Sequence, residues 1–264
     1  MHFHNEEYIL PWWLKHHVEL FDHGVLINHN STDSSADICR EITPHWDVVD
    51  SSLSEFSAVE TDSEVMRYEA SLPGWKMALN ATEFLVCTPE HLNEKLQILN
   101  FNNQRCLQTR GVVMADIAPD QRPSKDIPLI RQKCHGYFEE EHVYLRKRRV
   151  NLWKIISTLR LDLGALKNHR NRIMHSYSTG AYSVGRHATS HRIDERSKNI
   201  YTFWYGFSPW SSEMVARKLQ FKSRIPRMDR ERGVGFQHLF DRDELSSRFN
   251  LHRSKSRDLS RLLP

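Results

Sequence analysis

The sequence lacks the features of a protein that spans a membrane, is exported or is held together by disulfide bonds. Its 264 residues contain no apolar run of about 18, the length that a membrane-crossing helix needs. The opening segment MHFHNEEYIL has neither the basic region nor the apolar core of a secretory signal. The four cysteines (Cys39, Cys87, Cys106 and Cys134) have no CxxC spacing, so they predict reduced thiols and no zinc knuckle. We therefore expect a cytoplasmic protein.

Two further absences reduce the range of possible functions and folds. No GxGxxG motif follows the early apolar runs, which excludes the usual nicotinamide-binding oxidoreductase. The chain also contains no internal repeat and no low-complexity segment. What remains is ordinary globular composition, with 39% hydrophobic and 27% charged residues, enough for one large domain or two small ones with a buried core.

Acidic residues are scarce in the second part of the chain. Residues 1–100 contain 5 Lys+Arg and 17 Asp+Glu; from totals of 37 and 33, this leaves 32 basic and 16 acidic residues for positions 101–264. The split indicates a surface for nucleic acid, anionic lipid headgroups or a sugar-nucleotide pyrophosphate, unless the two parts pack together and neutralise each other. Because no nucleic-acid-binding module is recognisable, we expect no nucleic acid partner, whereas a peripheral membrane contact stays open.

The first hundred residues alternate short apolar runs with helical patterns. This alternation predicts an α/β fold with a parallel sheet and right-handed crossovers. The expected helices cover residues 8–21, 36–42 and 60–70, and the expected strands cover 25–27, 46–49, 76–79 and 83–86.

The pattern of apolar and charged residues changes after residue 100. The pattern predicts a strand at 112–115, a loop at 116–128, a helix at 209–221 and a charged, partly disordered tail at 242–264, and it leaves 150–163 open between a strand pair and a helix. We therefore divide the chain into a nucleotide-binding half at 1–100, the rest of the core with the acceptor-binding region at 101–241, and the tail at 242–264.

Three polar motifs follow predicted strands or precede a predicted helix. They are His4-Asn5-Glu6-Glu7, the segment 28–34 (NHNSTDS) and Asn80-Ala81-Thr82-Glu83. In an open α/β sheet, ligands bind at the carboxyl ends of the strands. Together the three motifs therefore predict a site that holds a nucleoside and its phosphates, although each alone is common turn chemistry.

The same segments resemble a known family. HNEEYILPWWLKHHVELFDHGVLINHNSTDSSADI is similar to the opening of family-2-like glycosyltransferases with a GT-A fold, and WKMALNATEFLV is similar to their W-x-x-x-x-D-x-D-E-F-L segment. The resemblance covers residues 1 to about 90 and weakens beyond them. It implies a Rossmann-like nucleotide-sugar-binding sheet with a basic C-terminal acceptor-side region. Only three residues precede His4, so the family's first strand is either minimal here or begins earlier.

By this resemblance the chain transfers a sugar from a nucleotide-sugar donor to a hydroxyl acceptor of the glycan, polysaccharide or lipopolysaccharide type. The donor-binding positions that it implies are Asn5, Glu6, Asn28, Asn30, Asn80 and Thr82. The family's two D-x-D carboxylates are replaced by Asn80 and Thr82. This replacement leaves open a second function, that of a non-catalytic relative which binds a nucleotide sugar or a glycan.

The replacement also bears on the cofactor. The family's D-x-D binds a divalent metal (Mn or Mg), and such cations prefer carboxylate oxygens. Asn80 and Thr82 contribute no charge, so metal dependence stays open. Glu83 is the carboxylate left in the motif, and it is expected either to ligate a metal, with His187 as a second ligand, or to act as a base.

Without a metal, basic side chains must stabilise the diphosphate leaving group. The candidates for phosphate or acceptor contact are Arg172, Arg186, His187 and His191. For the general base the sequence offers Asp116, Asp120 and Glu83; we choose Asp116 because it follows the apolar run 112–115, the alternative being a loop aspartate that starts a turn. The aromatic group Trp204, Tyr205, Phe207 and Trp210 indicates either an acceptor subsite or core packing.

Overall fold

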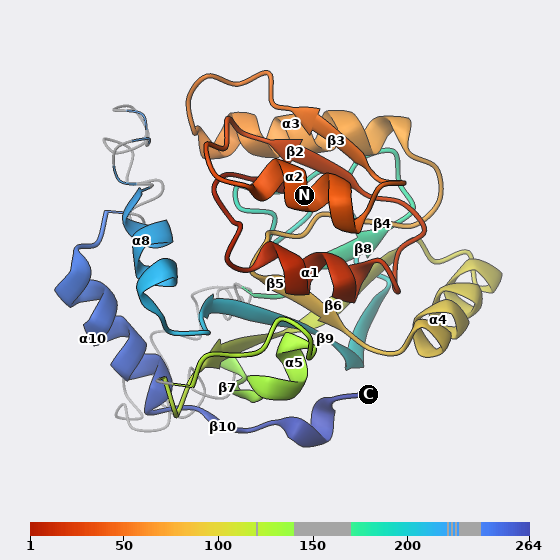
Figure 1. Ribbon diagram of the computed structural model, residues 1–264. Helices are drawn as coiled ribbons and strands as arrows, with labels where there is room; N and C mark the ends of the chain where they lie inside the picture. The colour runs from red at the N-terminus through yellow and green to blue at the C-terminus, as the bar shows by residue number, and fades with distance from the viewer. Residues whose placement is uncertain (120, 140–169, 221, 223, 225, 227–238) are drawn as a thin grey trace, which may run out of the picture.

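The computed structural model describes residues 1–119, 121–139, 170–220, 222, 224, 226 and 239–264. The segment 150–163 and Asp120 lie outside these residues. In Figure 1 the N-terminal elements form an upper layer, and the second sheet lies below and behind helix α1. Among the described residues, no helix has the length and apolar character needed to cross a membrane.

A small parallel sheet forms the N-terminal layer. Strands β1 (His2–Phe3), β2 (Val25–Asn28) and β3 (Asp47–Asp50) lie in the order β1-β2-β3, with both pairings parallel. Helix α1 (Leu10–His17) connects the first two strands and α2 (Ser35–Ile42) connects the next two, while α3 (Ala58–Ser71) follows β3. The predicted alternation of strand and helix is confirmed for this layer, and Pro11 lies in the first turn of α1, where proline is tolerated.

A larger and mostly antiparallel sheet forms the rest of the core. Its described strands run in the order β10-β7-β6-β8-β4, with β9 pairing with both β5 and β6. Among the pairings of these described strands, only that of β6 with β9 is parallel. The strands are β4 (Lys76–Met77), β5 (Glu83–Val86), β6 (Cys106–Ala115), β7 (His135–Tyr137), β8 (Ile173–His175), β9 (Glu195–Phe207) and β10 (Arg257–Asp258).

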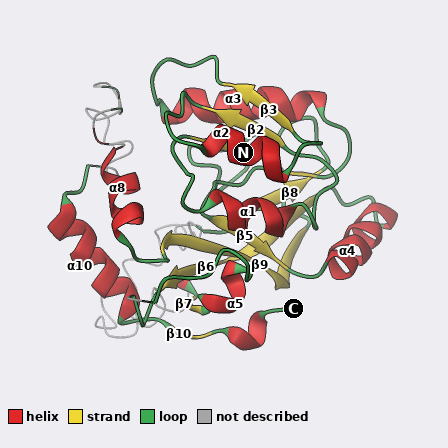
Figure 2. Cartoon of the chain, in the orientation of Figure 1, coloured by secondary structure: helices red, strands yellow, loops and turns green. Residues whose placement is uncertain are grey.

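The prediction of a parallel sheet is therefore wrong beyond β3. Strand β4 is short and pairs with β8, and β5 pairs antiparallel with β9, which lies more than a hundred residues further along the chain. Apolar periodicity identifies a buried strand but carries no information about its partner or direction. Helices α4 (Pro89–Phe101) and α5 (Leu129–Gln132) flank this sheet, as Figure 2 shows.

Helix α1 covers the free edge of β5 with side chains. Trp13 Nε1 donates to the carbonyl of Glu83 at 2.8 Å, and a ring nitrogen of His16 lies 2.7 Å from the carbonyl of Leu85. The amide of Leu85 donates to His17 Nε2 at 3.1 Å. Burial lowers the pKa of His17 well below its usual value, so the ring is neutral and accepts this bond. Trp13, His16 and His17 of α1 thus satisfy hydrogen-bonding groups of the β5 backbone that do not pair with β9.

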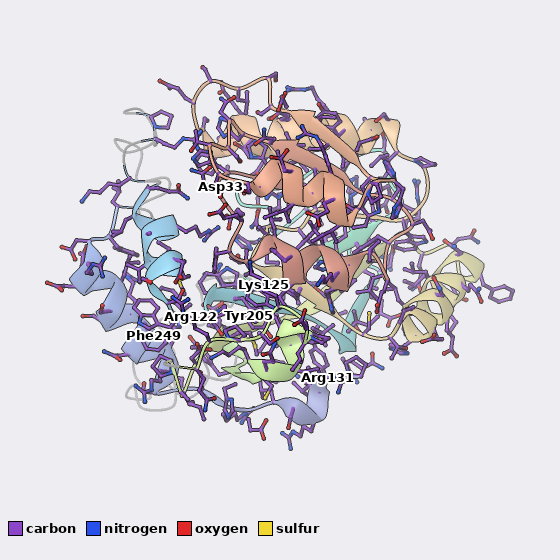
Figure 3. The ribbon with its side chains drawn as sticks, in the orientation of Figure 1. Asp33, Arg122, Lys125, Arg131, Tyr205 and Phe249 are labelled. Carbon is purple, nitrogen blue, oxygen red and sulfur yellow. The ribbon has the colours of Figure 1, made fainter. Side chains whose placement is uncertain are left out.

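The C-terminal segment is ordered, so the prediction of a partly disordered tail is wrong. Helix α10 (Arg242–Arg253) is followed by β10 and a short 3-10 helix, η4 (Ser260–Leu262). Leu245 and Phe249, one turn apart on α10, pack with Met214 of α8 (Ser212–Gln220) and with Phe207 of β9. Figure 1 shows α8 and α10 side by side, and Figure 3 shows Phe249 between them. Two apolar residues on one face order a segment whose other positions are mostly polar or charged.

Helix α10 begins with a capping box, which yields a test of this ordering. The amide of Glu244 donates to Asp241 Oδ1 at 2.8 Å, and the amide of Asp241 donates to Glu244 Oε2 at 2.9 Å. We expect Asp241→Ala to lower the free energy of unfolding by about 1 kcal/mol in urea denaturation. The control is Asp243→Ala, which removes an exposed carboxylate from the same turn without a capping bond. Equal losses in the two variants would contradict the capping role.

Candidate donor site at the Asn80–Glu83 turn

The third sequence motif forms a tight turn between β4 and β5. The amide of Glu83 donates to the carbonyl of Asn80 at 2.9 Å, and the amide of Asn80 donates to Glu83 Oε2 at 2.9 Å. The carboxylate of Glu83 therefore lies inside its own turn. Thr82, between them, is buried, and its carbonyl accepts a hydrogen bond from the amide of Tyr205 at 2.7 Å.

A buried ion pair closes this turn from the side of β8. Arg172 Nε donates to Glu83 Oε2 at 2.7 Å, and Arg172 Nη2 donates to Glu83 Oε1. Both side chains are 1% exposed. The remaining guanidinium nitrogen, Nη1, lies 2.9 Å from the carbonyl of Gly185 and 2.7 Å from His187 Nδ1. Arg172 thus uses its planar set of donors to join the turn to the segment around residue 185.

A second buried arginine contacts Asn80. Arg186 Nη2 donates to Asn80 Oδ1, and Arg186 Nη1 donates to Asp62 Oδ1 on α3. The amide of Gly185 donates to the other Asp62 oxygen at 2.6 Å. Arg186 is buried, and its Nε has no hydrogen-bond partner among the residues that the structure describes. The backbone of Arg186 has φ 58°, an uncommon conformation for arginine, and Asp62 holds it there.

The loop that carries Arg186 is anchored on α3 by a second carboxylate. Glu69 accepts from the amide of Gly180 at 2.8 Å and from the hydroxyl of Tyr182 at 2.8 Å. Burial opposes ionisation of Glu69, but its hydrogen bonds, with His175 first, outweigh burial and lower the pKa. His191 stacks on a neighbouring tyrosine of the same loop, with ring centroids 3.9 Å apart. The loop is therefore built to hold Arg186 against Asn80.

These contacts decide how well a divalent metal fits the turn. Asn80 Oδ1 accepts from Arg186, and both oxygens of Glu83 accept from Arg172. Arg172 also lies between Glu83 and His187, the pair predicted from the sequence as metal ligands. The oxygens that would ligate a metal thus already bind guanidinium groups, and this donor set does not fit a divalent cation.

The first two motifs interlock at the ends of β1 and β2. Asn5 Oδ1 accepts from the amide of Thr32 at 2.8 Å, and Glu7 Oε2 accepts from the amide of Ser34 at 3.0 Å. Asn5 and Asn30 have φ 48° and 54°, left-handed conformations that asparagine tolerates better than most residues. The two turns thus brace each other across neighbouring strand ends.

The other two predicted donor-binding residues, Asn28 and Glu6, have different surroundings. Asn28 Nδ2 donates to Asp50 Oδ1 at 3.0 Å, a contact between neighbouring strand ends that is exposed. Glu6 is buried and forms a bidentate ion pair with Arg217 of α8, with Nε–O distances of 2.7 and 2.8 Å. Asn28 therefore stays accessible, whereas Glu6 binds α8 to the first turn.

Asp116 lies in a separate place, at the end of β6. Its carboxylate accepts from the hydroxyl of Ser208, from the amide of Trp210 at 2.8 Å and from Lys133 Nζ at 3.3 Å. The side chain is buried. These contacts indicate that Asp116 shapes the chain after β9, and its role as a base stays a prediction.

The aromatic group 204–210 packs mainly within the protein. Trp210 stacks on Phe249 with ring centroids 4.3 Å apart, and the hydroxyl of Tyr205 donates to the carbonyl of Lys133 at 2.8 Å. Figure 3 places Tyr205 in the interior. The contacts favour core packing over a sugar-stacking subsite.

Sequence reasoning missed Asp62 and Glu69, the two carboxylates that position the loop. The sequence does contain a pattern that indicates them: the two residues lie seven positions apart on α3, on the same face as the buried Val65. Buried carboxylates need partners, so acidic residues on the apolar face of a helix indicate cations elsewhere.

Comparison with known proteins finds no family model that matches the sequence and no curated protein with significant similarity to it. The resemblance to family-2-like glycosyltransferases therefore rests on the three motifs alone.

Proposed function

We propose that the protein is a metal-independent glycosyltransferase of the GT-A type. It transfers a sugar from a nucleotide-sugar donor to a hydroxyl acceptor of the glycan, polysaccharide or lipopolysaccharide type. The observation that carries the proposal is the guanidinium of Arg186, which is held on Asn80 at the D-x-D position and whose Nε has no partner in the described part of the chain. The polar turns at the ends of β1 and β2 support the donor site, because ligands of open α/β sheets bind at such ends.

The chemistry explains why a guanidinium suits this position. During transfer, the bond from the anomeric carbon to the diphosphate oxygen breaks, and the acceptor oxygen bonds to that carbon as its proton leaves to a base. Negative charge grows on the diphosphate, and preorganised positive groups stabilise it most in a buried site. Arg186 provides such a group: its guanidinium also balances Asp62, and among the described residues its Nε–H has no acceptor, while arginine is well suited to phosphate oxygens.

One observation favours the second candidate function, binding of a nucleotide sugar or glycan without turnover. The carboxylates of Glu83 and Asp116, both expected from the sequence as bases, already accept hydrogen bonds from buried partners. A catalytic base needs an oxygen that reaches the acceptor proton. A transferase and a non-catalytic protein that binds a nucleotide sugar differ in turnover but not in donor binding.

A donor screen separates them. UDP-, GDP-, CMP- and dTDP-sugars are tested by thermal shift and by donor hydrolysis, each with manganese and with EDTA. We expect one base class to stabilise the protein and to turn over equally in both conditions. Binding without turnover would support the second candidate, whereas an absolute need for manganese would refute the role of Arg186. Absence of binding by all four classes would refute the transferase and the nucleotide-sugar form of the second candidate, and would leave glycan binding alone.

A further inference from the structure

A cluster of cations lies outside the Asn80–Glu83 turn, around two aromatic rings of β9. The guanidinium carbon of Arg170 lies 3.5 Å from the ring centroid of Trp204. Lys218 Nζ on α8 lies 4.3 Å from the ring centroid of Phe207 and 5.7 Å from that of Trp204. Arg217, the neighbour of Lys218 on α8, adds a third cation. Aromatic faces attract cations but carry no net charge, so they hold these side chains in place without neutralising them.

In the described part of the chain, the carboxylates near this cluster pair with its arginines and leave Lys218 without one. Glu6 forms its bidentate pair with Arg217, and Glu139 favours the charged form of Arg170. Lys218 is half-buried, and no carboxylate in the described part of the chain pairs with it. The charges of Arg217 and Arg170 repel the ammonium of Lys218 in a partly buried place. An added anion would relieve this repulsion.

The titration of Lys218 agrees with this charge imbalance. Burial, followed by the charges of Arg217 and Arg170, lowers the pKa of Lys218 to about 7. A bound anion favours the protonated amine, so binding above pH 7 must draw a proton from solvent. Besides its three cations, the charged and titratable groups that face the cluster in the described part of the chain are Glu6, Tyr8, Glu83, Tyr137, Glu139, Arg172, Arg248, His252 and Lys255. Burial first, then the charge of Arg170, lowers the pKa of His252 to about 3, so this ring is neutral above pH 7 and takes up no proton there.

The cluster adjoins the turn at residues 4–7, which the sequence predicts to bind the donor. Arg217 binds Glu6, and Gln220 of the same helix accepts from Asn5 Nδ2 at 3.0 Å. We propose that Lys218, together with Arg170 and Arg217, binds an anionic group of the acceptor, a phosphate or a carboxylate carried by the acceptor glycan. This assignment of acceptor class rests on the proposed transferase function, whereas the anion site itself does not.

Inorganic phosphate is the probe, measured by isothermal titration calorimetry at pH 8 in two buffers of different ionisation enthalpy. We expect one phosphate site with proton uptake in the wild-type protein. Lys218→Met should weaken binding about tenfold, the loss of one charge-assisted contact, and abolish the uptake. Lys218→Arg should bind phosphate without uptake, because arginine stays protonated. Lys198→Met, the same change at an exposed lysine of β9, should match the wild type.

The outcomes separate the two proposals. Absence of phosphate binding, or equal binding by the wild type and a folded Lys218→Met variant, would refute the anion site, even if the donor turns over. Phosphate binding in a protein that turns over no donor would refute the transferase and leave the anion site. Competition between phosphate and the donor identified by the screen would refute the acceptor assignment, because the site would then hold the donor's diphosphate. We expect both ligands to bind together.

Discussion

Arg172→Met is expected to lower the free energy of unfolding by about 3–5 kcal/mol, because it leaves a buried carboxylate without its partner. Glu83 is 1% exposed, and Arg172 supplies a hydrogen bond to each of its oxygens. Methionine fills part of the volume but offers no donor. The carbonyl of Gly185 also loses a hydrogen bond of 2.9 Å. Urea denaturation monitored by circular dichroism measures the loss.

The matched control is Arg40→Met on the surface. Arg40 pairs with Asp37 at 3.2 Å, but the two side chains are 57% and 85% exposed, so we expect a loss below about 1 kcal/mol. The double variant Glu83→Gln/Arg172→Met should recover part of the stability, because a neutral amide is less costly to bury unpaired than a carboxylate. A loss for Arg172→Met no greater than that for Arg40→Met would contradict the structural role of the pair.

Arg186→Gln is expected to lower kcat by about 10²–10³-fold if the guanidinium stabilises the leaving diphosphate. Glutamine has a single amide group and no charge, so Asn80 and the diphosphate lose their cation. The effect should fall on kcat more than on KM, because charge on the diphosphate grows towards the transition state. Arg186→Lys, which keeps a positive charge without the planar set of donors, should show an intermediate loss.

Arg186 also neutralises Asp62, so loss of folding must be separated from loss of catalysis. The double variant Asp62→Asn/Arg186→Gln removes both charges and leaves no unpaired buried carboxylate. We expect it to fold, to bind the donor and to stay as slow as Arg186→Gln. Steady-state kinetics with the donor from the screen, together with thermal unfolding, measure both properties. An unchanged kcat in this folded double variant would exclude Arg186 from catalysis.

The sequence by itself determined the N-terminal layer. Its short apolar runs alternate with helical patterns, and strands buried on both faces of a parallel sheet have that signature. The polar motif after β2 was placed correctly for the same reason, since a turn must follow each strand, whereas the motif at residues 4–7 was predicted from its place directly before a helix. The position of the Asn80–Glu83 turn was also predicted, because it lies between two apolar runs.

Only the tertiary structure decided what those polar residues contact. Arg172 lies 89 residues from Glu83 along the chain, and Arg186 lies 106 residues from Asn80. The local sequence pattern does not show which of the basic candidates contacts the Asn80–Glu83 turn, because these contacts depend on which strands become neighbours in the fold. His191 shows the consequence: it was a candidate for phosphate contact, but it lies within the loop and a ring nitrogen is 2.8 Å from the carbonyl of Thr179.

The tail shows the same division between local and long-range information. High charge predicted solvation of residues 242–264, and most of these side chains are indeed solvated or half-buried. The sequence did encode the helix start at Asp241 and the apolar pair Leu245 and Phe249. Their partners, Met214 and Phe207, come from segments about 30 to 40 residues earlier. A pair of apolar residues stabilises a charged helix only where the fold provides a surface to cover them, and the local sequence carries no record of that surface.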